Sequence, residues 1–213
     1  MKILNLYAGI GGNRKLWGDK HEITAIEYDA ATADVYSSYF PNDNVIVTDA
    51  HKFLLDHYKE FDFIWSSPPC PTHSIMNTTK NGKGLKMEYP DMQLYQQVIF
   101  LQYWFKGKWV VENVVPYYEP LINPTKKIDR HYWWSNFPLG EFNYKRPFKM
   151  DTAKISDYEK YLGFDLSGFK LKNKIKNLRN CVNPKTGKYI LNCAMGKTEK
   201  QNNNQVDIFD FIK

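Results

Sequence analysis

The sequence predicts an α/β fold, in which a doubly wound, mostly parallel sheet of Rossmann-like type is followed by a small irregular C-terminal lobe. Short apolar runs alternate with helical patterns over the first 65 residues. A glycine turn, AGIGG at residues 8–12, follows the first apolar run, and the pentamer SPPCP at 67–71 follows the fourth. Repeats of strand, turn and helix predict parallel strands joined by right-handed crossovers.

The first third of the chain supplies these elements in regular order. We expect strands at residues 2–8, 21–28, 45–48 and 61–65. Helices are expected at 13–17, at 30–40, where Pro41 stops the helix, and at 51–58. This alternation places the segments in one sheet, with their carboxyl ends at a common edge.

The rest of the chain is less regular. Residues 76–87 are polar and glycine-containing, which predicts a mobile loop without helix. A helix at 89–105, begun by Pro90 and Asp91, and strands at 109–112 and 132–137 extend the sheet. Residues 138–177 are predicted to be irregular, 178–193 end in a helix, and 197–205 form a loose polar tail. The predicted divisions are a main domain at 1–137, a small lobe at 138–177 and a return segment with a tail at 178–213.

The composition favours a nucleic-acid partner over a membrane. The 213 residues carry a net charge of +6 and have a sequence pI of about 9.0. No apolar run approaches the roughly 20 residues that span a bilayer. Three cysteines and a start without a signal peptide predict a cytoplasmic location. The five histidines are scattered and no cysteine pair has ligand spacing, so we expect no metal site.

Candidate ligand-binding residues lie at successive strand ends. The glycine turn lets the backbone approach a ligand closely. Glu27 ends the second strand and is placed to accept hydrogen bonds from ribose hydroxyls, while Asp49 follows the third and suits an adenine amino group. Arg14 stands where a dinucleotide fingerprint needs its third glycine, so the turn is a poor NAD motif. Together these residues predict a nucleoside-bearing cofactor.

The pentamer SPPCP presents a single reactive thiol. Two prolines fix φ and remove two backbone donors, so the chain turns out of the sheet with Cys70 at its rim. Glu112 ends a later strand and supplies an acid. The sequence therefore predicts a nucleophile and an acid at one edge of the sheet.

In this order the motifs resemble those of the cytosine-carbon-5 DNA methyltransferases. NLYAGIGG at 5–12 is similar to the family's D-L-F-A-G-x-G-G, PPC at 68–70 to its nucleophile motif, and ENV at 112–114 to its E-N-V motif. DRH at 129–131 falls at the arginine motif, and RNCVNP at 179–184 resembles the late G-N-x-V-x-P. The resemblance covers nearly the whole chain and indicates a compact, phage-like member without a full target-recognition domain.

The resemblance implies S-adenosylmethionine as cofactor, the sheet of S-adenosylmethionine-dependent methyltransferases, and a cytosine flipped out of duplex DNA as substrate. A thiolate from Cys70 adds at carbon-6, a protonated Glu112 serves ring nitrogen-3, and Arg130 supports the base or the other two residues. The expected cofactor-binding residues are Tyr7, Ala8, Gly9, Gly11, Gly12, Glu27, Tyr28, Asp49, Ala50, Pro68 and Asn180. The expected substrate-binding residues are Pro69, Ser74, Lys80, Lys83, Asn113 and Val114.

The sequence departs from the family pattern in several places. Asn5 replaces an aspartate, Pro71 and His73 replace a glutamine and a phenylalanine, and Arg179 replaces a glycine. Only residues 131–179 separate Arg130 from Asn180, where relatives carry a recognition domain. Either the lobe is a minimal recognition element, or specificity is low, or a protein partner supplies it.

Two features of this region have open interpretations. The basic residues of 170–179 form one charged face if extended, which suits phosphate contacts, or else a solvated surface. The aromatic residues either stack on bases or form a small core; they are Phe142, Tyr144, Phe148, Tyr158, Tyr161, Phe164 and Phe169.

Other functions remain open alongside DNA methylation. A compact chain suits RNA or a free cytidine nucleotide as substrate, and a catalytically inactive nucleic-acid-binding homologue would keep the same fold. The motifs also suit a phage or restriction-modification role in a bacterial or phage-infected cell. Retention of both Cys70 and Glu112 favours an active enzyme.

Overall fold

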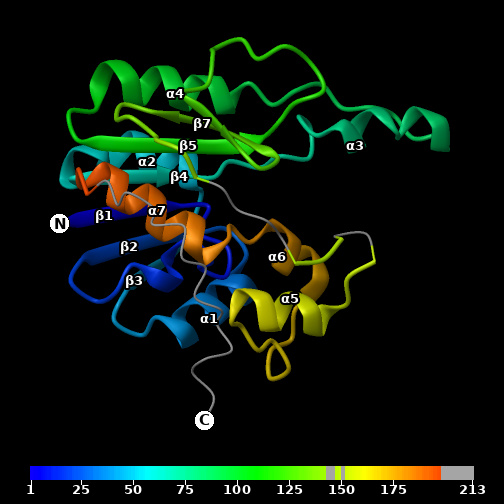
Figure 1. Ribbon diagram of the computed structural model, residues 1–213, viewed down its shortest axis with the longest axis horizontal. Helices are drawn as coiled ribbons and strands as arrows, with labels where there is room; N and C mark the ends of the chain where they lie inside the picture. Colours follow the sequence, from blue (N-terminus) through cyan, green and yellow to red (C-terminus); the bar gives the residue numbers. More distant parts are fainter. Residues whose placement is uncertain (143–146, 150–151, 198–213) are drawn as a thin grey trace.

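The computed structural model describes residues 1–142, 147–149 and 152–197. In this part of the chain, a seven-stranded sheet has the order β3-β2-β1-β4-β5-β7-β6 (Figure 1). Its strands are β1 (Lys2–Leu6), β2 (Glu22–Glu27), β3 (Asn44–Val47), β4 (Phe63–Ser66), β5 (Lys108–Val114), β6 (Lys126–Ile128) and β7 (His131–Ser135). The first five strands pair in parallel, and β7 runs antiparallel to both β5 and β6. The predicted doubly wound, mostly parallel sheet is confirmed.

The helices flank this sheet and connect its strands. They are α1 (Ala30–Tyr39), α2 (Ala50–His57), α3 (Ile75–Thr78), α4 (Gln93–Trp104), α5 (Ile155–Leu162), α6 (Lys174–Asn180) and α7 (Pro184–Ala194). Short 3-10 helices are η1 (Arg14–Leu16), η2 (Tyr58–Glu60) and η3 (Asn81–Lys83). Local sequence sets their ends: Asp29 caps α1 by accepting a hydrogen bond from the Thr32 amide at 2.9 Å, and Pro41 follows its last turn.

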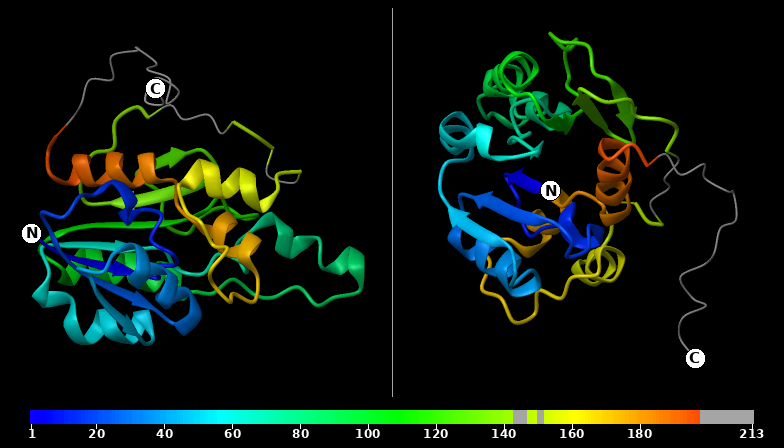
Figure 2. Two further views of the ribbon diagram at one scale, coloured as in Figure 1. Left: turned by 90° about the horizontal axis from the view of Figure 1, so that it is seen from below. Right: turned by 90° about the vertical axis from the view of Figure 1, so that its left-hand side faces the viewer.

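Separate apolar cores cover the two faces of the sheet. On one face, α2 and α4 pack over Leu4, Leu6 and Ile64. On the other, α7 packs over Ile3, Ile23 and Phe63, together with three tryptophans, Trp17, Trp65 and Trp133. Figure 2 shows α2 and α4 on one side of the sheet and α7 on the other. Alternate residues of each buried strand serve the two cores, as expected for a sheet covered on both sides.

The segment after β7 packs on α1 and the glycine turn. Its buried residues, among them Tyr158, Leu162 and Phe164, share a core with Ala8 and Ile10. The Tyr39 hydroxyl accepts a hydrogen bond from the Asp165 amide at 2.6 Å and donates one to the Asp165 carbonyl at 3.0 Å. These contacts join the small lobe to the domain that precedes it.

Several predicted elements were wrong. Residues 13–17 form only the 3-10 turn η1, because Asn13 turns inward to bond with Asn5. The segment 76–87 is not free of helix: Ser74 caps α3 through the Met76 amide at 3.2 Å, and η3 follows. The three-residue strand β6 was not predicted.

The lobe is also more regular than predicted. It contains α5, which ends at Gly163 in the left-handed conformation with φ of 72°, and the start of α6. Since Lys174 and Lys176 lie in α6, the basic stretch is not extended and its alternate lysines do not share one face. The predicted helix at the end of 178–193 is confirmed as α7. The predicted tail at 197–205 lies outside the described residues from position 198 onward.

The aromatic residues of the lobe mostly form a core. Tyr158 and Phe164 are buried, and Phe148, Tyr161 and Phe169 pack against the same cluster. Phe142 stacks on Tyr189 of α7, with ring centroids 4.4 Å apart, and Tyr144 lies outside the described residues.

None of the helices in 1–142, 147–149 and 152–197 is long and apolar enough to span a membrane. Within the same ranges, no three His, Cys, Asp or Glu side chains are grouped so as to hold a metal ion.

Candidate active site

The glycine turn after β1 is held against the end of β2. The Gly9 amide donates a hydrogen bond to Glu27 Oε2 at 2.9 Å, and the Ala8 amide donates to the Ile26 carbonyl at 2.9 Å. Tyr7 and Gly9 both have φ of 56°. This left-handed conformation is uncommon for a residue with a side chain, such as Tyr7. Glu27 therefore fixes the turn, and its remaining lone pairs are available to a ligand.

The glycines of the turn have different reasons to be glycine. A Cβ on Gly11 would lie 2.3 Å from the ring of Phe40, and one on Gly12 would lie 2.1 Å from Cys181 Sγ and 2.3 Å from the Val182 carbonyl oxygen. A Cβ on Gly9 would meet nothing within 4 Å. Gly11 and Gly12 thus permit close packing of the protein on itself, while Gly9 leaves open space beside a turn of the backbone.

Acidic and aromatic residues lie at the adjoining strand ends. The Tyr28 side chain is 79% exposed beyond β2. Asp49 is exposed and caps α2, with Oδ1 accepting a hydrogen bond from the Lys52 amide at 2.7 Å. Ala50 is buried in the first turn of α2, and Asn180 is exposed at the end of α6. The open side of Gly9, the Glu27 carboxylate and the exposed Tyr28 ring fit a nucleoside with ribose hydroxyls to donate.

The segment after β4 forms a turn around the thiol of Cys70. The Cys70 carbonyl accepts hydrogen bonds from the amides of His73 and Ser74, both at 3.1 Å. The Tyr117 amide donates to the His73 carbonyl at 3.1 Å, and Ser74 forms an isolated bridge with Pro116. The backbone of this turn is therefore held between β4 and the residues that follow β5, and the Cys70 thiol is partly buried.

Glu112 on β5 is a buried acid. Its side chain is removed from water, and this burial raises the pKa of Glu112 to about 7, although a hydrogen bond from Ser67 and the charge of Arg130 act to lower it. Burial also raises the pKa of the Cys70 thiol, with a further increase from the negative charge of Glu112 and a decrease from Arg130. The thiol and the acid are therefore electrostatically coupled at one edge of the sheet.

Asn113 connects the two segments that carry these groups. Its Nδ2 donates a hydrogen bond to the Pro68 carbonyl at 2.9 Å, and its Oδ1 accepts one from the Val114 amide at 3.0 Å. Asn113 is 1% exposed. Since Pro68 and Pro69 directly precede the thiol, this amide fixes the segment that carries Cys70 relative to the end of β5.

Arg130 and the late RNCVNP segment lie together. The Arg130 guanidinium donates from Nη2 to the Arg179 carbonyl at 3.1 Å. Asn183 caps α7 by accepting from the amides of Lys185 at 2.8 Å and Thr186 at 3.3 Å. Together with the packing of Gly12 on Cys181, these contacts return the late segment to the glycine turn, as the sequence motif predicted.

The lysines after the thiol have different surroundings. Lys80 Nζ pairs with the Glu88 carboxylate, whereas Lys83 is exposed in η3. Ile75 and Met76 are exposed beside them, at 62% and 65%. Figure 1 shows α3 projecting beyond the sheet.

The sequence motifs missed other residues around the site. His131 Nε2 lies 3.9 Å from Glu112 Oε2, on the antiparallel neighbour of β5. Ser67 contacts Glu112, and the His73 ring shares a hydrogen bond with the Tyr118 hydroxyl. His131 could have been found from the sequence because it directly follows the predicted Arg130. Tyr118 could not, since its contact with His73 depends on the path of the loop after β5.

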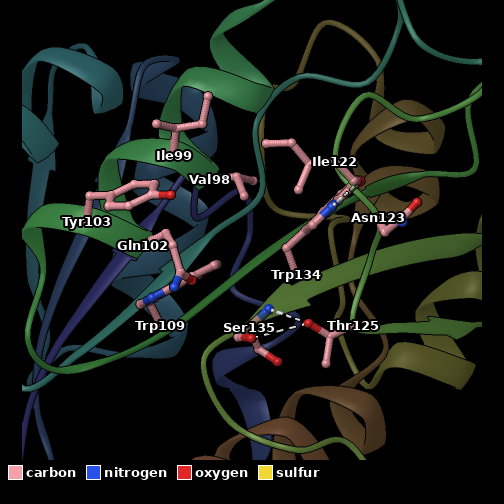
Figure 3. Close-up of a pocket in the computed structure, with 10 residues that line it drawn as sticks. All are labelled: Val98, Ile99, Gln102, Tyr103, Trp109, Ile122, Asn123, Thr125, Trp134 and Ser135. Atoms are coloured by element: carbon pink, nitrogen blue, oxygen red, sulfur yellow. Dashed lines mark hydrogen bonds between the residues drawn. The ribbon is translucent and has the colours of Figure 1, made fainter.

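A cavity of about 470 Å³ lies away from these residues, between α4 and the strands β5 and β7 (Figure 3). Its walls are mainly apolar and include Val98, Ile99, Trp109 and Trp134. Two polar lining residues are bonded to each other, because the Ser135 amide donates to Thr125 Oγ1 at 3.0 Å. The residues of the candidate active site do not line this cavity.

Comparison with known proteins gives the family. A search of curated proteins found no match. Among solved structures, Escherichia coli yhhF is 17% identical, with a TM-score of 0.42, over 63% of this chain and 73% of its own. A Spodoptera frugiperda DNMT2 mutant is 25% identical, with a TM-score of 0.37, over 53% of this chain and 35% of its own. A SAM-dependent methyltransferase from Agrobacterium tumefaciens is 14% identical, with a TM-score of 0.39, over 55% of this chain and 40% of its own.

The family model described as C-5 cytosine-specific DNA methylase matches residues 1–117. This match covers more than half of the 213 residues and includes the glycine turn, Cys70 and Glu112. The chain belongs to the C-5 cytosine-specific DNA methylases.

Proposed function

We propose that this protein transfers a methyl group from S-adenosylmethionine to carbon-5 of a cytosine flipped out of duplex DNA. The observation that carries the proposal is the coupling of Cys70 to a buried acid, Glu112, whose pKa is raised to about 7. A nucleophilic thiol and an acid that is still protonated near neutral pH are the two groups that activation of a cytosine ring requires.

The cofactor site of this proposal is the edge formed by the glycine turn and the ends of β2 and β3. Gly9 leaves space for the ligand, the Glu27 carboxylate accepts ribose hydroxyls, and Asp49 lies near the adenine. The other proposed contacts are Tyr7, Ala8, Gly11, Gly12, Tyr28, Ala50, Pro68 and Asn180. S-adenosylmethionine, when bound, supplies an electrophilic methyl group.

The residues of the chain activate the base. The Cys70 thiolate forms a bond to carbon-6, and the electron pair of the 5,6 double bond moves to carbon-5 and, through carbon-4, onto ring nitrogen-3. A protonated Glu112 donates a hydrogen bond to ring nitrogen-3 and thereby stabilises the negative charge. After carbon-5 is methylated, a base removes its proton, the double bond re-forms, and the thiolate leaves carbon-6.

Other residues support these two groups. Asn113 is proposed to position the Pro68 and Pro69 turn through its bonded amide, and Arg130 to stabilise the charges of Cys70 and Glu112. Pro69, Ser74 and Val114 line the approach to the base, and Lys80 and Lys83 lie on the segment that faces the phosphates. A base cannot be reached inside a duplex, so this arrangement requires flipping.

The position of the small lobe favours a second substrate class as the alternative. Five of its described aromatic residues pack on α1 and the glycine turn, so they are not available to stack on bases; they are Phe148, Tyr158, Tyr161, Phe164 and Phe169. The short spacing between Arg130 and Asn180 suits RNA or a free cytidine nucleotide as substrate, or a protein partner that supplies the target sequence. We also propose a phage or restriction-modification role and a cytoplasmic location for this protein.

The decisive experiment is covalent trapping on DNA that contains 5-fluorocytosine, in the presence of S-adenosylmethionine. Fluorine stands at carbon-5 in place of the proton that must be removed before the thiolate can leave. The wild-type protein should therefore remain covalently attached to the DNA. Cys70→Ala should form no adduct, and Cys193→Ala, which alters a buried thiol on α7, should still form one. Adducts with RNA alone would support the alternative, and failure to form an adduct with any nucleic acid would contradict the proposed mechanism.

A further inference from the structure

Two buried polar side chains, Gln97 and Ser66, and the partly buried Tyr7 connect the glycine turn to the strand that carries the Cys70 segment. Gln97 Nε2 donates a hydrogen bond to the Tyr7 hydroxyl at 2.6 Å, and Ser66 Oγ donates one to Gln97 Oε1 at 2.6 Å. Gln97 and Ser66 are both 0% exposed. Burial raises the pKa of Tyr7 to about 12, although the hydrogen bond from Gln97 acts to lower it, so the hydroxyl is protonated at neutral pH.

Gln97 occupies a position where α4 otherwise buries apolar side chains. Leu94, Val98 and Leu101 are buried on the face of α4 that packs on the sheet, and Gln97 lies among them at helical spacing. A side-chain amide buried there is unfavourable unless both its donor and its acceptor are used. Both are used, and their partners are Ser66 at the end of β4 and Tyr7, the residue that follows β1.

The Tyr7 end of this connection lies in a constrained part of the backbone. Tyr7 has φ of 56°, in the left-handed region that residues with a side chain rarely adopt. Its hydroxyl is anchored by Gln97, and the neighbouring Gly9 amide is anchored by Glu27. The ring and the backbone of the turn are therefore held at separate points.

The Ser66 end lies next to the acid. Ser66 and Leu6 are register partners on β4 and β1, so the residues that follow them, Ser67 and Tyr7, leave the sheet at neighbouring strand ends. Successive residues of a strand face opposite sides, and Ser67 contacts Glu112 and accepts a hydrogen bond from Trp65 Nε1 at 2.8 Å. The two adjacent serines thus connect one strand end to the cofactor turn and to the acid.

We propose that Gln97 is a positioning residue, which sets the orientation of Tyr7 in the cofactor turn relative to the end of β4 from which the Cys70 segment departs. The inference rests on the proposed function for its effect on cofactor binding, but its structural effect is measurable without cofactor. No residue of this connection other than Tyr7 contacts a ligand in the proposed mechanism.

The test compares Gln97→Leu, Tyr7→Phe and the double variant with the wild type. Each single variant removes the bond between residues 7 and 97 while nearly preserving volume, so each should weaken S-adenosylmethionine binding about threefold to tenfold by calorimetry. With DNA substrate, KM for the cofactor should rise by a similar factor while kcat changes less. The double variant should be no weaker than the worse single variant, because both remove the same bond.

Hydrogen exchange of the cofactor-free protein separates this inference from the proposed function. Amides at 7–12 should exchange faster in Gln97→Leu, with α7 unchanged. The matched control is Gln96→Leu, the exposed neighbour on α4, which should behave as wild type. Unchanged exchange at 7–12, or effects of the two single variants that add in full, would overturn the inference. A wild type that binds no cofactor would contradict the proposed function, and the exchange result would still decide the role of Gln97.

Discussion

The side-chain amide of Asn113 donates a hydrogen bond to the carbonyl oxygen of Pro68 at 2.9 Å. This single contact joins two motifs that are 45 residues apart in the chain. It places the segment that carries Cys70 beside the strand that carries Glu112, and neither segment could adopt this arrangement alone.

Replacement of Asn113 should therefore reduce both the stability of the protein and its activity. Asn113→Ala leaves the Pro68 carbonyl and the Val114 amide without their partner, which should lower the free energy of unfolding by about 1–3 kcal/mol. Methyl transfer should fall at least about tenfold because the thiol is less well positioned. Initial rates and urea unfolding measure the two effects. Asn136→Ala serves as the control: this exposed asparagine follows β7 and accepts a hydrogen bond from the Trp109 amide near the start of β5. Equal losses of activity in both variants would refute the role of Asn113.

The reactivity of Cys70 should depend on the charge of Glu112. The negative carboxylate raises the pKa of the thiol and Arg130 lowers it. Glu112→Gln should therefore shift the midpoint of the Cys70 alkylation rate to lower pH, and Arg130→Ala should shift it to higher pH. The alkylation rate with iodoacetamide is measured from about pH 6 to about pH 10, a range that includes the ordinary pKa of a thiol. The Cys70→Ala variant gives the background rate from Cys181 and Cys193. Shifts in the opposite directions would contradict the coupling.

Stability should fall as pH rises through the titration of Glu112. Its pKa is about 7 in the folded protein and near the usual 4.5 when unfolded, so the folded state binds the extra proton between these values. Folding is therefore favoured below pH 4.5, and this contribution is lost as pH rises through 7, with an upper limit of roughly 3 kcal/mol. Glu112→Gln should remove this contribution and be more stable than wild type at pH 8. Unfolding free energies of both proteins at pH 5 and pH 8 provide the comparison, and parallel pH dependences would exclude Glu112 as the source.

The glycines of the turn should respond differently to alanine. Gly12→Ala places a Cβ against Cys181 and the Val182 carbonyl, so it should destabilise the protein by about 1–3 kcal/mol. Gly9→Ala meets no atom within 4 Å and costs only about 1 kcal/mol, from its φ of 56°. Its main effect should be on S-adenosylmethionine affinity, because the methyl group occupies the open side of the turn. Thermal unfolding and calorimetric titration distinguish the two, and a Gly9→Ala protein with unchanged affinity would place the cofactor elsewhere.

The parallel sheet and the succession of motifs along the chain could be predicted from the sequence because they depend on local patterns. Alternating apolar runs predicted the parallel strands, and the glycine turn and the two prolines predicted the ends of β1 and β4. The lobe was predicted poorly because α5 is short and its apolar residues, Tyr158 and Leu162, gain stability only by packing on α1 and the glycine turn.

The sequence alone determined the class of fold, the family motifs, and Cys70 and Glu112 as the candidate chemical groups. Tertiary structure decided the electrostatics of those groups: the pKa of Glu112 is near 7 because β5 is covered on both sides, and that burial is a property of the assembled sheet. It also decided that Gln97, Ser66 and Tyr7 form one buried connection, since hydrogen bonds between three separate elements depend on how α4 packs on β1 and β4. Motifs record which residues are present, whereas burial and contact between distant segments exist only once the chain has folded.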